Sequence, residues 1–328
     1  MSTFLWPVGA YRFHALSRTV AASAVEVEDA LSSLFPATGH AVAVSSGRAG
    51  LALALTTIGL KRPDLVEVPP YASHCVLDAV SRIATPLASG AEGARAACVI
   101  YHQWGYVQAR ALPSTEIIED ACDSLCRPGT KLFPLRGRFE LWSLPKILGC
   151  ASGGVVWCHR GEDAETLRRL RDSRREAARM QFTLRLLGRR FPSLLDYWAG
   201  RETLCGHLTR PAAADVLEAF SRWSELAAER EARFAMFGPY LPTWLSRSNE
   251  RLPCVVPIHY ESRLDAALHG IGIQIGRRHL ERVHVDGRVE LVPVLPVPIH
   301  QGVPLPLLEQ TAGVLERHEA PRIVRESQ

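Results

Sequence analysis

Only three of the 38 basic side chains in this 328-residue chain are lysines, namely Lys61, Lys131 and Lys146. An amine can lose its proton and attack a carbonyl, whereas a guanidinium stays charged in a protein. Lys146 also precedes Gly153 and Gly154, which let backbone or ligand come close. We therefore expect Lys146 to form a Schiff base with a carbonyl cofactor such as pyridoxal phosphate. The alternative is a surface lysine that survives by chance in an arginine-biased sequence.

Two upstream features supply what such a cofactor needs. A turn at residues 45–49 follows an apolar run and opens an Ala/Leu-rich helix, whose first backbone N–H groups can bind a phosphate. Asp120 ends a second apolar run, where a carboxylate can keep a pyridine nitrogen protonated. Each feature has an ordinary alternative on its own. Most strand–turn–helix junctions bind nothing, and a lone acid at a strand end is more often a helix cap or a surface charge.

Composition excludes several other classes of protein. The hydrophobic share of 47% and the formal charge of +4 describe a globular chain without the footprint of a nucleic-acid binder. The eight cysteines form no C-x-x-C pair, and the twelve histidines form no His-x-x-x-His pair, so no metal site is expected. No stretch of 18 or more apolar residues and no signal peptide is recognisable. We expect a cytoplasmic protein with reduced thiols and no membrane span.

Short apolar runs alternate with helical patterns through the first half of the chain. We expect strands at 40–45, 65–68, 97–101, 116–119 and 155–158, and helices at 25–34, 47–59 and 73–83. This alternation predicts a parallel sheet with helices on both faces, whose chemistry gathers at the carboxyl ends of the strands. The 45–49 turn and Asp120 lie at such ends, and Lys146 is expected in a loop before the next strand. One shared site is implied.

The second half has a different character. Residues 161–190 read as one long arginine-rich helix, whose charges predict a solvated face or, alternatively, a phosphate-binding surface. A further helix is expected at 209–231, strands at 252–260 and 289–299, and a last helix at 305–318. We expect a large domain at 1–200, with an N-terminal arm, and a small C-terminal α+β domain at 201–328.

The order of these motifs and the residues in them resemble those of the DegT/DnrJ/EryC1/StrS family of pyridoxal-phosphate-dependent sugar aminotransferases. The resemblance covers roughly residues 40–160. The matching segments are Val44–Leu51, Val68–Tyr71, His102–Gly105, Ile118–Ala121 and Ser143–Lys146 with Gly153–Gly154.

The resemblance implies fold type I of the pyridoxal-phosphate-dependent transferases, which is the aspartate aminotransferase-like fold, and a homodimer. It also implies transfer of an amino group, with glutamate as donor, to a keto-deoxysugar linked to a nucleotide. The residues that it places at the cofactor are Lys146 as the Schiff-base lysine and proton shuttle, Asp120 at the pyridinium nitrogen, Gly47, Arg48 and Ala49 with Ser143 at the phosphate, and His74, with Tyr71 second, as the stacking ring. A helix-capping role is the alternative for His74 and Tyr71.

Two departures from the family pattern leave other functions open. Asp123 stands where the family has histidine or glutamine, so a second carboxylate is placed near the cofactor. The Gly-x-Asn-x-Arg-Met motif that reaches the partner subunit's phosphate is missing, since the only asparagine is Asn249, and Arg179-Met180 is at most a remnant. A catalytically silent binding or regulatory homologue is one alternative. A sugar dehydratase of the same family is another, although a histidine typically replaces the lysine there.

Overall fold

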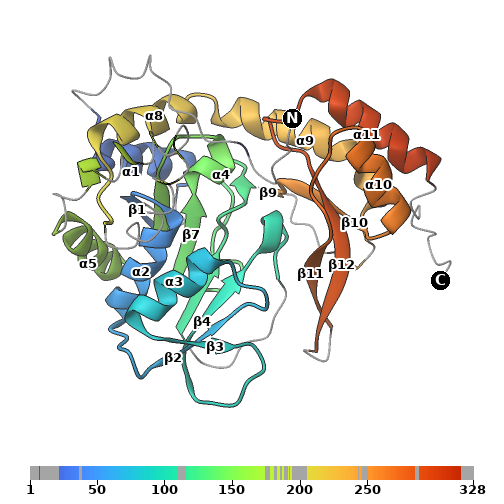
Figure 1. Ribbon diagram of the computed structural model, residues 1–328. Helices are drawn as coiled ribbons and strands as arrows, with labels where there is room; N and C mark the ends of the chain where they lie inside the picture. Colours follow the sequence, from blue (N-terminus) through green and yellow to red (C-terminus); the bar gives the residue numbers. More distant parts are fainter. Residues whose placement is uncertain are drawn as a thin grey trace.

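The chain builds a large mixed sheet and a small antiparallel sheet, joined by a two-stranded ladder (Figure 1). The computed structural model describes residues 7, 22–36, 39–108, 116–173, 178–180, 183, 184, 187, 191, 193, 205–242, 244, 245, 250–284 and 288–318. The expected N-terminal arm and the expected domain boundary near residue 200 lie outside these residues.

The large sheet has seven strands in the order β1-β8-β7-β5-β4-β2-β3. Their bounds are β1 (His40–Val44), β2 (Leu65–Val68), β3 (Thr85–Ala88), β4 (Arg95–Tyr101), β5 (Glu116–Asp120), β7 (Phe139–Ser143) and β8 (Gly154–Cys158). All neighbouring pairs are parallel except those made by β8, which runs antiparallel to both β1 and β7. The expected, mainly parallel α/β sheet is confirmed.

Helices cover both faces of this sheet, and each face has its own apolar core. One face packs against α2 (Gly47–Ile58), α3 (His74–Ile83) and α5 (Gly161–Asp172). The other packs against α1 (Ala24–Leu34), α4 (Leu144–Leu148), α8 (Arg210–Phe220) and the start of α9 (Trp223–Ala235). Strands such as β1 and β8 are buried on both sides, and they therefore read in the sequence as continuous apolar runs.

The small sheet lies to one side of the large one, with the order β10-β12-β11 (Figure 1). Its strands are β10 (Val255–His259), β11 (Arg278–Val283) and β12 (Val289–Pro298), and its helices are α10 (Ser262–Gly270) and α11 (Leu305–Arg317). The ladder between the sheets pairs β6 (Leu125–Cys126) with β9 (Arg251–Leu252). Helix α9 passes from the core of the large sheet to that of the small one, where Phe234 packs.

Three expectations about elements were wrong. Lys146 lies on a short helix, α4, rather than in a loop. The expected helix at 209–231 is two helices, because α8 ends at Phe220 and α9 begins at Trp223. The expected helix at 161–190 is not one element, because α5 ends at Asp172. Beyond that end, residues 178–180, 183, 184 and 187 are helical, and much of the remaining stretch to 190 lies outside the described residues. Strands β3, β7 and β11 and helix α10 were not expected.

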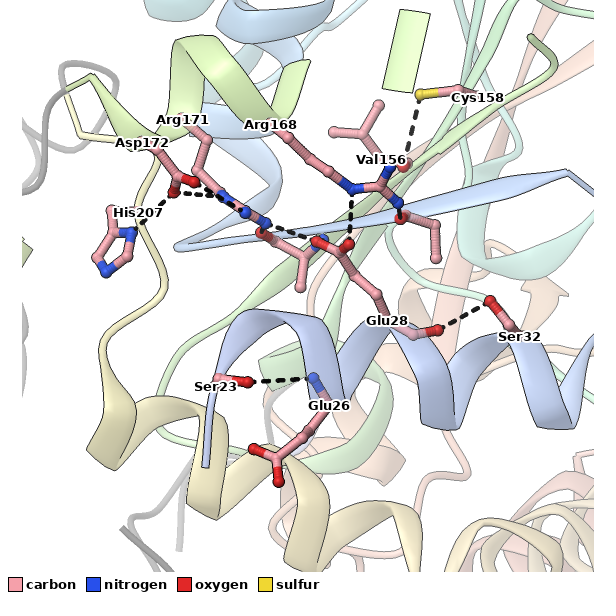
Figure 2. Close-up of polar contacts among 12 residues, drawn as sticks. Ser23, Glu26, Glu28, Ser32, Val156, Cys158, Arg168, Arg171, Asp172 and His207 are labelled. Carbon is pink, nitrogen blue, oxygen red and sulfur yellow. Dashed lines mark hydrogen bonds and ion pairs between the residues drawn. The ribbon is translucent and has the colours of Figure 1, made fainter. Parts of the chain in front are cut away.

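The arginines of α5 do not form one solvated face. Arg171 is 3% exposed, and its Nη1 lies 2.5 Å from Glu28 Oε1 on α1 and 3.0 Å from the carbonyl oxygen of Ala43. Arg168 binds the other oxygen of Glu28 at 2.8 Å and the carbonyl of Ala41 (Figure 2). These two arginines therefore satisfy the free edge of β1 and tie α5 to α1. Arg169 and Arg179 are exposed, while Arg174, Arg175, Arg185, Arg189 and Arg190 lie outside the described residues.

A buried ion pair fixes the strand that precedes α4. Glu140 on β7 accepts two hydrogen bonds from the guanidinium of Arg251 on β9, at 2.9 and 2.8 Å. It also accepts the backbone N–H of Phe133 and the indole N–H of Trp142. Because every partner is buried, this network joins the β6–β9 ladder to the end of β7, directly before the lysine helix.

Candidate functional site

Lys146 stands on α4, which begins as soon as β7 ends. Pro145 in the first turn suits a helix start, and Gly149, with φ of 72°, ends the helix in the left-handed conformation. The helix is therefore short and defined by its sequence at both ends. It presents Lys146 at the carboxyl end of β7, with 31% of the side chain exposed.

Asp120 is the last residue of β5, which pairs in parallel with β7, so its carboxylate lies at the same edge of the sheet. It is 7% exposed, and its Oδ1 accepts the backbone N–H of Cys122 at 3.1 Å. Burial raises the pKa of Asp120, and hydrogen bonding to Cys122 and the charge of Lys146 oppose this rise. The lysine and the strand-end acid thus share one electrostatic neighbourhood, as the sequence predicts.

Asp123 is the direct partner of the lysine. Its Oδ1 lies 3.0 Å from Lys146 Nζ, and its Oδ2 accepts the hydroxyl of Tyr101 on β4. Asp123 itself is fully buried. Burial alone would lower the pKa of Lys146, but the charge of Asp123 raises it above the usual lysine value, and Cys122 and Asp120 contribute in the same direction. The residue that departs from the family pattern therefore holds the lysine as an ammonium ion.

The first turn of α2 lies beside the turn that follows Asp120 and beside the start of α4. Ser46 caps the helix by accepting the N–H of Ala49 at 3.1 Å. A Cβ on Gly47 would lie 2.9 Å from Cys122 Sγ and 3.5 Å from Ser143 Cβ. The helix start thus touches both the Asp120 turn and the beginning of α4, and a larger residue at position 47 would displace the Cys122 side chain. Arg48 and Ala49 follow directly, with their backbone N–H groups in the first turn.

The two candidates for a stacking ring lie on the segment between β2 and α3. His74 is exposed at the start of α3, with Nε2 3.4 Å from Cys75 Sγ, and Cys75 in turn accepts a hydrogen bond of 2.7 Å from Arg48 Nη2. Tyr71 is 74% exposed and stacks on His279 of the small sheet, with ring centroids 4.9 Å apart. The N-cap position of α3 is Ser73, so neither ring occupies it.

These features fit pyridoxal phosphate. A helix N-terminus from which side-chain bulk is excluded at Gly47 suits a phosphate. Burial raises the pKa of the Asp120 carboxylate, which means that its negative charge is costly in this position. A protonated pyridine nitrogen beside it would offset that cost by forming an ion pair. An amine lies within the same neighbourhood. The residues present therefore fit the three demands of that cofactor.

Three residues around the lysine were not expected from the sequence. Tyr101 ends β4 opposite Asp120 in the sheet register, so the strand-end rule could have found it. Arg230 on α9 and Gln301 both contact the carbonyl of Ile147, the residue after Lys146, and no local signal marks either. His102, which follows the end of β4, is buried, with Nε2 2.8 Å from Glu119 Oε2.

Other kinds of site find no support in the described part of the chain. It holds no group of three or more His, Cys, Asp or Glu side chains that could bind a metal ion. Among the same residues, no helix combines the length and apolar character that a bilayer span needs.

Comparisons with known proteins agree with this geometry. A family model described as "Putative PLP-dependent aminotransferase" matches residues 29–310. No curated protein sequence matches the chain. Among solved structures, the fold resembles the sugar aminotransferase CalS13 from Micromonospora echinospora, with a TM-score of 0.65 and 18% identity over 96% of this chain and 99% of that one.

Two other solved structures share the fold. One is a DegT DnrJ EryC1 StrS aminotransferase from Brucella abortus, with a TM-score of 0.63 and 15% identity over 93% and 94% of the two chains. The other is DesI in the presence of its TDP-sugar product, with a TM-score of 0.66 and 16% identity over 96% and 92%. At these identities the likeness shows the fold, and it confirms the expected fold type I. The family model covers most of the chain and therefore identifies its family. The chain belongs to the family described as "Putative PLP-dependent aminotransferase", and its cofactor is pyridoxal phosphate.

Proposed function

We propose that this aminotransferase transfers an amino group from glutamate to the keto group of a deoxysugar carried on a nucleotide. The observation that carries the proposal is the meeting of Lys146, Asp120 and the start of α2 at one edge of the large sheet. The sugar substrate is supported by the structural neighbours, one a sugar aminotransferase and another solved with its TDP-sugar product.

When bound, pyridoxal phosphate supplies an electron sink that stabilises negative charge next to the reacting nitrogen. Asp120 would hold the ring nitrogen, since its carboxylate is buried and oriented by the Cys122 N–H. Lys146 would anchor the cofactor and move protons at its Nζ. The phosphate would lie at Gly47, Arg48, Ala49 and Ser143, and His74 or Tyr71 would cover the ring.

Asp123 belongs to the same proposed set, but its contacts define a different task from that of Asp120. It faces the lysine amine at 3.0 Å and accepts the Tyr101 hydroxyl. It would therefore act on the protonation of Lys146 in addition to lining the cofactor site.

We further propose a homodimer in the cytoplasm, divided into the large and small domains expected from the sequence. All eight cysteines are free thiols, which suits a reducing compartment. Light scattering at micromolar and nanomolar concentrations would show whether the mass corresponds to two chains, with and without the cofactor.

The first experiment compares Lys146→Ala with Lys131→Ala after addition of pyridoxal phosphate. Lys131 is exposed, so its variant is the matched control. We expect a visible absorbance band, sensitive to borohydride, in the wild type and in Lys131→Ala but not in Lys146→Ala. A colourless wild-type protein, or a full band in Lys146→Ala, would refute the assignment of the lysine.

The second experiment tests the substrate. Keto-sugar nucleotides are supplied with glutamate, and formation of 2-oxoglutarate is measured for the wild type and for Asp120→Asn, which keeps the shape of the side chain but removes its charge. We expect turnover with the wild type and its loss in the variant. If glutamate is consumed only with keto acids and never with keto sugars, the transferase assignment stands and the sugar proposal is wrong.

A further inference from the structure

Lys146 must be a neutral amine to attack a carbonyl, yet the structure surrounds it with acids. Its Nζ lies 3.0 Å from Asp123 Oδ1, which is within hydrogen-bonding reach. Asp123 is fully buried, so water does not compete for that oxygen. The amine can therefore be freed only if its proton is accepted by a nearby group or leaves through the exposed third of the lysine side chain.

Tyr101 orients the carboxylate of Asp123. Its hydroxyl donates to Oδ2, the oxygen that does not face the lysine. Burial, followed by the charge of Asp123, raises the pKa of Tyr101 well above its usual value, so the phenol remains a donor at working pH. Oδ1 is thus left for Lys146. A phenol, a carboxylate and an ammonium group form one chain from β4 to α4.

We propose that Tyr101 and Asp123 form a proton store for Lys146: Asp123 keeps the lysine protonated in the cofactor-free protein and accepts that proton when the amine is required. The transfer balances within the pair. The N–H bond of Lys146 breaks, an O–H bond forms on Asp123 Oδ1, and the ion pair becomes a neutral amine beside a neutral acid. The net charge of the pair is zero before and after, so the step creates no isolated buried charge.

The other groups around the pair favour the same starting state. The charge of Asp123 acts on Arg230 of α9 and opposes the fall in the pKa of that guanidinium that burial causes, so a positive group lies within electrostatic reach of the pair. The thiols of Cys122 and Cys254 remain neutral, because burial raises the pKa of each well above the usual value. The titratable groups that act on the pair are Tyr101, Asp120, Cys122, Arg230 and Cys254.

This inference rests on the proposed role of Lys146 as the cofactor-binding amine, but it can be tested without amino transfer. The lysine-poor sequence makes the measurement simple. Reductive methylation with ¹³C-formaldehyde labels only Lys61, Lys131, Lys146 and the N-terminus of the cofactor-free full chain. Methyl ¹³C shifts followed against pH then give the pKa of each amine. Lys61 and Lys131 are exposed and serve as internal references, and the Lys146→Arg variant assigns the resonance.

We expect Lys146 to titrate at least one pH unit above the two references in the wild type. Asp123→Asn should lower this pKa by more than one unit, because burial lowers the pKa of a lysine and the carboxylate that offsets this effect is then absent. Asp123→Glu, which keeps the carboxylate, should restore most of the shift. Tyr101→Phe should leave the pKa of Lys146 unchanged or raise it, because a carboxylate that loses a donor becomes more basic. Loss of local structure would lower the pKa in both the asparagine and the phenylalanine variants.

Two results would overturn the proposal. One is a wild-type Lys146 that titrates together with Lys61 and Lys131. The other is a fall of the Lys146 pKa in Tyr101→Phe equal to that in Asp123→Asn. Failure of sugar amination with an intact Lys146 titration would count against the substrate alone, so the two proposals can fail separately.

Discussion

The guanidinium of Arg230 donates a hydrogen bond of 3.2 Å to the carbonyl of Ile147, the residue that follows Lys146. The same guanidinium binds Gln301 Oε1 at 2.6 Å, and the amide of Gln301 donates to the same carbonyl at 3.3 Å. Arg230 is 1% exposed, and burial lowers its pKa to about 10, so it remains charged at neutral pH. Two side chains from distant segments, Arg230 and Gln301, thus fix the position of helix α4 through the carbonyl of Ile147.

Replacing Arg230 with methionine should separate positioning from stability. Burying a charge is costly, and an apolar side chain of similar length removes that cost together with the hydrogen bonds, so the free energy of unfolding should change by less than about 1 kcal/mol. The carbonyl of Ile147 keeps only Gln301, and loss of a hydrogen bond worth about 1.4 kcal/mol should weaken cofactor binding about tenfold. Titration of the cofactor-free protein with pyridoxal phosphate measures this. Arg222→Met, at an exposed site at the start of α9, should change neither quantity.

Gly154 allows β8 to lie against the start of α2. A Cβ at this position would fall 2.5 Å from Ser46 C and 2.6 Å from Gly47 N, both backbone atoms of the proposed phosphate site. Gly154→Ala should therefore displace the first turn of α2, lower the free energy of unfolding by about 3 kcal/mol and weaken cofactor binding. Urea unfolding and cofactor titration report the two effects.

Gly270→Ala is the matched control for this substitution. A Cβ on Gly270 meets no atom within 4 Å, and the residue ends a helix. Alanine there should be neutral or stabilise the protein by up to about 1 kcal/mol. Equal effects of the two substitutions would contradict the argument from backbone contact.

The sequence predicts those features of the site that depend on local order. The strand–turn–helix unit that ends in α2 could be predicted because its strand, cap and helix are adjacent in the chain. The shared edge of Asp120 and Lys146 follows from a rule about parallel sheets, although Lys146 lies on a helix rather than in a loop. Neither feature needs knowledge of a distant partner.

Features that depend on distant partners could not be predicted. Arg171 lies in a run of charged residues typical of a solvated face, and it is buried only because Glu28, on a helix more than a hundred residues earlier, faces it. Arg230 is buried against a carbonyl that any residue at position 147 would offer. The contact between Asp123 and Lys146 depends on the side-chain directions of a turn and a short helix, which spacing alone does not determine.

The network around Glu28 gives a prediction for the edge strand β1. Arg171→Met should leave Glu28 and the carbonyl of Ala43 short of a donor and lower the free energy of unfolding by about 3 kcal/mol, since one partner of a buried ion pair is removed (Figure 2). Arg169→Met, two residues earlier on the exposed side of α5, should change it by less than about 0.5 kcal/mol. Thermal and urea unfolding measure both. Similar losses in the two variants would show that the arginines act through general charge instead of the contacts described.

The buried pair of Glu140 and Arg251 makes stability depend on pH with a definite sign. Burial alone would raise the pKa of Glu140, but the Arg251 guanidinium and the N–H donors of Phe133 and Trp142 outweigh it and hold the pKa below its usual value. The folded state therefore favours the ionised acid. Its contribution is fully present above the unfolded pKa of about 4.3 and is lost as the pH falls through the lower pKa of the folded state.

Arg251→Met should reverse that dependence. Without the guanidinium, burial raises the pKa of Glu140, so the variant should be less stable than the wild type by about 3–5 kcal/mol at pH 7 and by less at pH 5, where the acid begins to be protonated. Urea unfolding at both pH values measures the difference. Glu140→Leu combined with Arg251→Met should recover most of the stability, because no charge is then buried alone. A deficit that stays constant between pH 7 and pH 5, or a double variant less stable than Arg251→Met, would mean that packing rather than charge holds β9 against β7.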